Sequence, residues 1–422
     1  MNKRNKQFWL KDTAIVFVLK VFFTFCSFVS SVLLSRYFGG ERIGVYFSFV
    51  SALTIASVLC RCGIDNVITR FIASKVSIKK SAILMWAFSK LHITSYISVS
   101  ISVAIFGMSY FSSSHKGIHL AIAFAALFAP LLSYGAVYES AFKGIKNVKL
   151  YGFYNGVARF LLLCTAFGVI HFYEYLDIET YIVVHGIVLS FYLLFIYCHW
   201  LIIEKNLDME VGSTDIVMLN RSSPDNWIIA VLSVFMLHSL QVGVGFLSSQ
   251  QEAGLFGVSM RVASVLVFLL AAFNTVLAPR FAECSMASSN EALKLLYKRT
   301  TIICGLISVP IITLIWLFSS EILLLFGAEF IDAKLTLQVL LLGQLFKALV
   351  GPTGNLLIMS GNEAVQKKAV FISVIVLVSL GGGLIPVYGA LGAALSASAA
   401  VIVNNAISFI YVIDKFKNRE TT

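Results

Sequence analysis

The chain has 422 residues, of which 59% are hydrophobic and only 13% are charged, and its mean hydropathy is +0.88. An ordinary soluble domain carries about a quarter charged residues, so this chain lacks the polar surface that a soluble protein of its length needs. The composition therefore predicts an integral membrane protein and excludes the soluble enzyme classes. The net charge of +11 is explained by the positive-inside rule, so no nucleic-acid partner is expected.

The N-terminus is basic and then apolar from Thr13 onward, as at the start of a signal peptide. The apolar run is too long for a signal peptide and no small-residue cleavage site follows, so we interpret it as the first membrane helix. The seven cysteines lie within or at the ends of apolar segments, where free thiols are expected. Neither a metal site nor a cofactor is predicted.

Apolar runs predict about 12 membrane-spanning helices, because a hydrocarbon core about 30 Å thick needs about 20 residues per crossing. In chain order the predicted spans are residues 12–36, 43–66, 82–108, 118–141, 151–172, 179–203, 225–249, 254–280, 300–319, 335–360, 368–386 and 389–413. The long polar stretch 204–224 predicts a cytoplasmic linker between an N-terminal six-helix lobe (1–203) and a C-terminal six-helix lobe (225–422). The expected fold class is all-α.

The basic residues predict the orientation, because cytoplasmic loops of membrane proteins are enriched in Lys and Arg. With the N-terminus placed in the cytoplasm, the cytoplasmic segments hold 22 Lys and Arg residues and the opposite face holds four, namely Arg36, Arg42, Lys116 and Lys334. Both termini are therefore predicted to be cytoplasmic.

The two halves of the sequence resemble each other at a constant offset. Gly44-Val45-Tyr46 after the first span matches Gly254-Leu255-Phe256 after the seventh, and Arg70-Phe71 matches Arg280-Phe281; both pairs are 210 residues apart. This pattern predicts parallel six-helix repeats, the architecture of transporters that rock two lobes about a central cavity. Two halves with similar topology and no common design are the alternative.

Six basic residues lie inside the predicted spans, whereas all 21 acidic residues are assigned to span ends or loops, among them Glu321, Glu329 and Asp332. The six are Lys20, Arg61, Lys90, Arg159, Arg261 and Lys347. Charges in a membrane core normally face a cavity or a partner, although long side chains can also run to the headgroups. The pattern predicts a cation-only cavity without counter-ions, suited to a phosphate or pyrophosphate group.

Polar side chains within the spans supply candidate sugar contacts. The candidates are His238, Gln241, Asn274 and Asn355, whose hydrogen-bonding groups could bind sugar hydroxyls. Such residues more often hydrogen-bond one membrane helix to another, so this alternative stays open for each of them.

Short motifs spread along the chain resemble those of the bacterial O-antigen (Wzx-type) flippases. They are Ser35 to Tyr46 (SRYFGGERIGVY), Arg61 to Asp65 (RCGID), Glu252 to Val258 (EAGLFGV), Ala278 to Phe281 (APRF), Phe326 to Phe330 (FGAEF), Met359 to Glu363 (MSGNE) and Tyr388 to Ala394 (YGALGAA). This family belongs to the multidrug/oligosaccharidyl-lipid/polysaccharide exporter superfamily, which also contains the multidrug and toxin extrusion (MATE) transporters and the lipid II flippases.

The resemblance implies alternating access by a non-enzymatic flippase in the bacterial inner membrane. Its cargo would be an undecaprenyl-pyrophosphate-linked repeat unit, and a polysaccharide polymerase and a chain-length regulator would be its partners in lipopolysaccharide biosynthesis. Arg261 looks like the cavity arginine of the eighth helix of lipid II flippases. Where those flippases have an Arg-Asp pair in the first helix, this chain has Ser30-Ser31, which weakens a peptidoglycan-precursor interpretation.

Three alternatives remain open. A cation-coupled multidrug antiporter of the same fold usually needs a carboxylate inside the first lobe, and only Asp12 lies near. A major-facilitator transporter would carry a Gly/Asp/Arg-rich loop after the second helix, which residues 65–70 do not match. A membrane polysaccharide polymerase would need a large outward loop, whereas the longest outward connections are about 15 residues.

Overall fold

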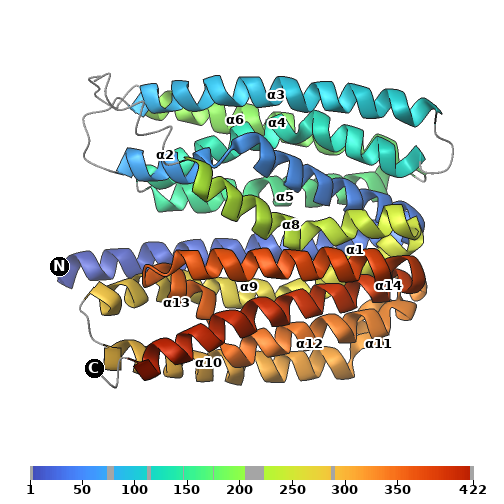
Figure 1. Ribbon diagram of the computed structural model, residues 1–422. Coiled ribbons are helices and arrows are strands. Elements are labelled where there is room, and N and C mark those ends of the chain that lie inside the picture. Colours follow the sequence, from blue (N-terminus) through green and yellow to red (C-terminus); the bar gives the residue numbers. More distant parts are fainter. Residues whose placement is uncertain are drawn as a thin grey trace. The chain divides into compact units, whose positions relative to one another are not determined.

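The computed structural model describes residues 3–73, 80–111, 116–145, 147–173, 175–204, 223–286 and 290–418. Within these ranges every regular element is a helix, which confirms the predicted all-α membrane fold (Figure 1). Most of the predicted linker, residues 205–222, lies outside the described residues.

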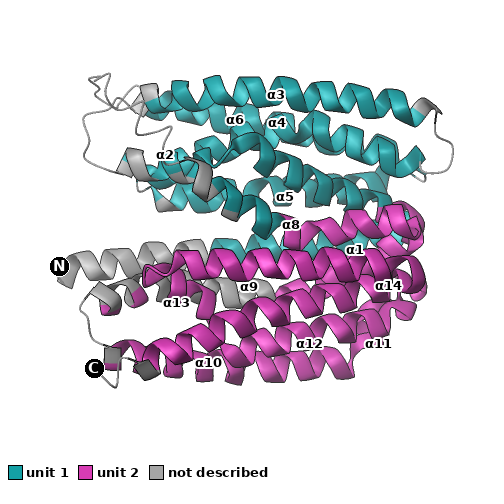
Figure 2. Ribbon diagram, viewed as in Figure 1, with its two compact units in different colours: residues 1–38, 45–234 teal, residues 39–44, 235–422 magenta. Residues whose placement is uncertain are grey.

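The chain divides into two compact units, shown in Figure 2: unit 1 comprises residues 1–38 and 45–234, and unit 2 comprises residues 39–44 and 235–422. The helices of the N-terminal half are α1 (Lys3–Arg61), α2 (Ile64–Ala73), α3 (Lys80–Phe111), α4 (Lys116–Gly144), α5 (Val148–Phe172) and α6 (Ile178–Glu204). Those of the C-terminal half are α8 (Ser223–Leu247), α9 (Gln250–Met286), α10 (Asn290–Leu317), α11 (Ser319–Leu324), the 3-10 helix η1 (Ala328–Ala333), α12 (Lys334–Val350), α13 (Thr353–Met359) and α14 (Glu363–Asn418).

Two of these helices each contain two membrane crossings. A straight helix of α1's 59 residues would be about 89 Å long, nearly three times the thickness of a hydrocarbon core. Instead α1 bends at Gly39 (φ 76°) and α14 bends at Gly389 (φ 54°), backbone conformations that favour glycine. The predicted separate spans on either side of each bend are therefore joined by a single residue with non-helical geometry.

Nine described helical segments are long and apolar enough to cross a membrane. Two of them, Val18–Arg61 and Glu363–Phe416, have 44 and 54 residues and supply a second crossing each, and α9 adds a further helix of 37 residues. The helices thus provide about 12 crossings, as the composition predicts. On which side of the membrane the termini lie stays a prediction.

The prediction of unbroken helices over residues 43–66 and 335–360 is wrong. The first is interrupted at Cys62 and Gly63, which both have positive φ, and the chain continues as α2. The second is interrupted at Gly351 (φ 82°) and Pro352, after which α13 begins. A proline cannot donate an amide hydrogen bond and a left-handed glycine ends a helix, so the Gly-Pro pair stops α12.

Helix α4 is the centre of unit 1, where it packs against α2, α3, α5 and α6. Ser98 and Ser102 of α3 donate hydrogen bonds of 2.7 Å to the carbonyls of Ala126 and Ala123 of α4, which holds the two apolar helices in register. In unit 2, α12 packs against α9, α10 and α14. The contacts of α4 bring α2, α5 and α6 together in unit 1, and these helices carry several of the polar and charged residues described below.

Candidate functional site

The break between α1 and α2 places a basic and an acidic residue together. Arg61 closes α1, and its guanidinium Nη1 lies 2.8 Å from Oδ2 of Asp65 in the first turn of α2. The Arg61 Nε also donates to the Ser57 carbonyl at 3.2 Å. With side chains 18% and 32% exposed, the pair is partly withdrawn from solvent. The prediction that the basic residues have no counter-ion in the chain is therefore wrong for Arg61.

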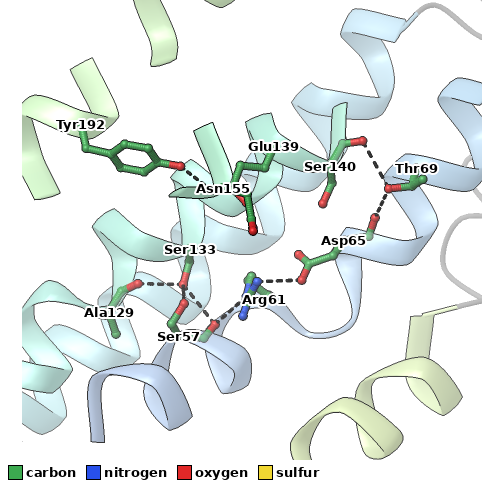
Figure 3. Close-up of polar contacts among 10 residues, drawn as sticks. All are labelled: Ser57, Arg61, Asp65, Thr69, Ala129, Ser133, Glu139, Ser140, Asn155 and Tyr192. Atoms are coloured by element: carbon green, nitrogen blue, oxygen red, sulfur yellow. Dashed lines mark hydrogen bonds and ion pairs between the residues drawn. The ribbon is translucent and has the colours of Figure 1, made fainter. Parts of the chain in front are cut away.

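A second acidic residue, Glu139, lies inside α4 and within the membrane span Lys116–Gly144. Its carboxylate accepts hydrogen bonds from Asn155 Nδ2 at 2.8 Å and from the Tyr192 hydroxyl at 2.5 Å. Figure 3 shows Glu139 and Asp65 in the same region as Arg61, and the charge of Arg61 acts on both carboxylates. The assignment of Glu139 to a span end is thus corrected, because neighbouring helices enclose its carboxylate.

Basic residues surround the two carboxylates. Arg159 of α5 interacts electrostatically with Glu139, and Lys20 of α1 interacts with both Arg159 and Lys143 of α4. Lys20, Arg61 and Arg159, predicted separately from three spans, are thereby brought into one group. We call Lys20, Arg61, Asp65, Glu139, Lys143 and Arg159 the charged cluster of unit 1. With four basic and two acidic residues, its formal charge is +2.

Hydroxyl groups fix the backbone beneath the charged cluster (Figure 3). The Ser133 hydroxyl of α4 lies 3.1 Å from the Ser57 carbonyl and 2.7 Å from the Ala129 carbonyl, so it links α4 to α1. The Thr69 hydroxyl of α2 lies 3.2 Å from the Ser140 carbonyl of α4. These bonds hold the helix ends that carry Arg61, Asp65 and Glu139.

The other three predicted basic residues lie elsewhere. Lys90 on α3 places its Nζ 4.9 Å from the centroid of the Trp86 ring, one turn away on the same helix, a cation–π contact. Arg261 on α9 interacts electrostatically with His238 on α8 in unit 2. Lys347 lies in the last turn of α12, beside the break at Gly351, rather than in the middle of a continuous helix.

The candidate sugar contacts differ in what surrounds them. Gln241 is buried and its Nε2 donates to the Ala253 carbonyl at 2.8 Å, so it joins α8 to α9. Asn355 lies on the short helix α13. The side chain of Asn274 lies outside the described residues.

Sequence reasoning missed Asp65, Glu139, Asn155 and Tyr192 as members of this site. The Asp65 pairing was visible as an i,i+4 spacing from Arg61, a separation at which helical side chains meet. Glu139 lay within the predicted span 118–141, two residues from its end, and its partners come from α5 and α6. No spacing in the sequence indicates those partners.

Comparisons with known proteins agree with this architecture. A family model described as MatE matches residues 227–384. An inward-facing MATE multidrug transporter of the MOP superfamily has a TM-score of 0.75 at 13% identity, covering 97% of this chain and 99% of the transporter. The lipid II flippase MurJ has a TM-score of 0.75 at 14% identity, covering 96% of this chain and 89% of MurJ.

A MOP superfamily transporter from Pyrococcus furiosus has a TM-score of 0.60 at 13% identity, covering 98% of this chain and 99% of that protein. No curated protein sequence matches this chain. Identities this low show the fold and leave the cargo open.

Proposed function

We propose that this chain, which has the fold of the MATE transporters and of the lipid II flippase, is a flippase for an anionic lipid-linked oligosaccharide. The proposed cargo is an undecaprenyl-pyrophosphate-linked O-antigen or similar surface-polysaccharide repeat unit, moved from the cytoplasmic to the periplasmic leaflet of the bacterial inner membrane by alternating access. The observation that carries the proposal is the charged cluster of unit 1, whose net positive charge lies among membrane helices.

The chemistry of the charged cluster suits a pyrophosphate headgroup. A guanidinium can bind two phosphate oxygens at once, and an ammonium group adds a point charge, so Arg159 with Lys20 and Lys143 would neutralise the pyrophosphate. Asp65 pairs with Arg61, and the charge of Arg61 also acts on Glu139, so the two carboxylates stabilise that guanidinium when no cargo is bound. Arg61, Glu139 and Lys143 lie near the helix ends that the Lys and Arg distribution assigns to the cytoplasm, where such a cargo is loaded.

The first test is deletion of the gene in its host, followed by gel analysis of surface lipopolysaccharide and extraction of lipid-linked sugars. We expect loss of the long-chain ladder and accumulation of undecaprenyl-linked repeat units, both reversed by the intact gene. An unchanged ladder would contradict the proposal. A single repeat unit that still reaches the surface would favour a polymerase, the partner expected to act with a chain-length regulator after the flippase.

Point variants test the cationic mechanism itself. Arg159→Ala, Arg261→Ala and Lys347→Ala should each reduce surface glycan at least about tenfold at native expression, since each removes a charge or hydrogen bonds worth about 1.5–3 kcal/mol to an anionic group. Arg261→Lys should retain part of the display because it keeps the charge. Lys298→Ala, at an exposed position of α10, is the matched control. Normal display by the three alanine variants would remove the mechanism.

Glu139 favours a second candidate, the cation-coupled multidrug antiporter. Such a transporter usually needs a carboxylate inside the N-terminal lobe. Glu139, enclosed by its hydrogen-bond partners on α5 and α6, is a better candidate for this group than Asp12. Glu139→Gln keeps hydrogen-bonding capacity toward Asn155 and Tyr192 but removes the charge. Under this second candidate, the variant would raise drug sensitivity while the lipopolysaccharide ladder stayed unchanged.

A further inference from the structure

The bend of α1 belongs to a different compact unit from the helical segments on either side of it. Residues 1–38 and 45–61 lie in unit 1, whereas Gly39–Gly44 group with unit 2 (Figure 2). The chain therefore enters unit 2 for six residues and then returns to unit 1.

Contacts within unit 2 hold this bend closely. The Gly40 amide donates to Glu329 Oε1 at 2.8 Å, and the same carboxylate lies against Gly39. The bend also packs backbone to backbone on the start of α9. A Cβ added at Gly44 would lie 1.9 Å from the Gln250 carbonyl oxygen, and one added at Gly254 would lie 2.1 Å from the Gly40 carbonyl oxygen. Only glycine permits both approaches.

The two backbone contacts are related by the internal repeat. Gly44 corresponds to Gly254 at the 210-residue offset, and Gly40 corresponds to Gln250 at the same offset. The contact from Gly44 to residue 250 and the contact from Gly254 to residue 40 are thus equivalent under exchange of the two repeats. Such reciprocity is the signature of a local two-fold axis that passes between the bend and α9.

We propose that the bend Gly39–Gly44, docked on Gln250–Gly254 and Glu329, is a releasable clasp that opens in each transport cycle. This inference rests on the alternating access of the proposed function. When the two units move as rigid bodies, a segment that is bound to unit 2 but continuous with unit 1 is pulled by both, and its contacts with unit 2 separate. The contacts named above are one hydrogen bond to the exposed Glu329 carboxylate and two backbone approaches at the buried Gly44 and Gly254, so water can hydrogen-bond the Gly40 amide and the carboxylate once the bend leaves α9. The positive-inside distribution assigns this side to the outer face.

The bend of α14 provides an internal comparison. The Ala390 amide, directly after Gly389, donates to Glu252 Oε2 at 2.7 Å, the same type of latch. Both flanks of that bend lie in unit 2, so it has no reason to open when the units move.

Hydrogen exchange measured by mass spectrometry tests the clasp without any substrate. Gly44→Ala, Gly254→Ala and Glu329→Ala should each raise amide exchange in the peptide carrying Gly40–Tyr46 at least about threefold. Gly107→Ala and Gly305→Ala, where an added Cβ meets no atom within 4 Å, should leave this peptide unchanged. Unchanged exchange in all three clasp variants would overturn the proposal.

A cross-link tests whether release is required for transport. A Cβ added at Gly40 lies 3.7 Å from Gln251 Cγ, the atom whose place the sulfur of Gln251→Cys would take, and the Gly40 φ is not left-handed. In a background without the native cysteines, oxidised Gly40→Cys/Gln251→Cys should lose glycolipid export at least about tenfold, and a reductant should restore it. Full export by the oxidised protein would refute a releasable clasp. If the native protein exports no glycolipid in the same assay, the cargo assignment fails, while the exchange experiment still decides the clasp.

Discussion

At the scale of single residues, the main feature of the charged cluster is that some of its charges have a partner within the protein. A charge within a membrane span costs at least about 2.5–3.5 kcal/mol, and removing one partner of a buried pair leaves the other uncompensated. Asp65 and the Ser57 carbonyl stabilise the charge of Arg61, and hydrogen bonds from Asn155 and Tyr192 stabilise the Glu139 carboxylate. Arg159, Lys20 and Lys143 are the cations that we propose bind the ligand.

A double-mutant cycle on Arg61 and Asp65 measures this compensation. Asp65→Ala should lower the unfolding free energy by about 1–3 kcal/mol, because a charge-assisted hydrogen bond in a partly buried site is lost. The Arg61→Ala/Asp65→Ala double variant should cost less than the sum of the single variants, as expected of direct partners. Thermal stability of the purified protein in lipid nanodiscs is the measurement. Strict additivity would show that the two side chains do not stabilise each other.

At the scale of helices, glycine decides where elements bend and how closely they approach. Gly39 and Gly389 fold α1 and α14 back on themselves, and Gly351 with Pro352 ends α12 beside Lys347. On α5, Gly156 faces Phe23 of α1 so closely that an added Cβ would lie 1.9 Å from a ring carbon. In lipid there is no hydrophobic force that drives helices together, so small residues at such positions stabilise the pair by allowing close van der Waals packing.

Gly156→Ala should separate α1 from α5 and destabilise the protein by about 1–3 kcal/mol, the usual cost of overpacking. Gly168→Ala, on the same helix with no atom within 4 Å of an added Cβ, should be neutral or slightly stabilising, because alanine is the better helix former. The midpoint temperature of each variant in the same lipid gives the comparison. Equal midpoints would mean that α1 does not pack on Gly156.

At the scale of the whole molecule, two compact units and about 12 crossings are the architecture in which alternating access is expected. The cargo proposal also depends on orientation, because the charged cluster must open to the leaflet in which lipid-linked sugars are made. The 22 to 4 distribution of basic residues fixes that expectation.

Reporter fusions test the orientation. A fluorescent protein fused after Asn418 should fluoresce and alkaline phosphatase fused there should be inactive, because the C-terminus is predicted to be cytoplasmic. Fusions after Tyr175, in the connection between α5 and α6, should behave in the opposite way. Active phosphatase at Asn418 would invert the topology, and with it the leaflet from which the charged cluster loads.

The sequence alone determined the membrane class, the all-α fold and about 12 crossings, because hydropathy and helix length respond to the bilayer locally. It also identified Gly44 and Gly254 as equivalent positions of a repeat. The helix breaks at Cys62–Gly63 and Gly351–Pro352 left signals in the sequence, as did the spacing of Arg61 and Asp65. Only the tertiary structure showed that Glu139 hydrogen-bonds to Asn155 and Tyr192, that Lys20 lies within electrostatic range of Arg159, and that Gly44 and Gly254 lie together. Those contacts depend on which helices are neighbours. In an apolar chain most helix faces are equally hydrophobic, so the periodicity of hydrophobic residues does not indicate which face of a helix packs against which neighbour.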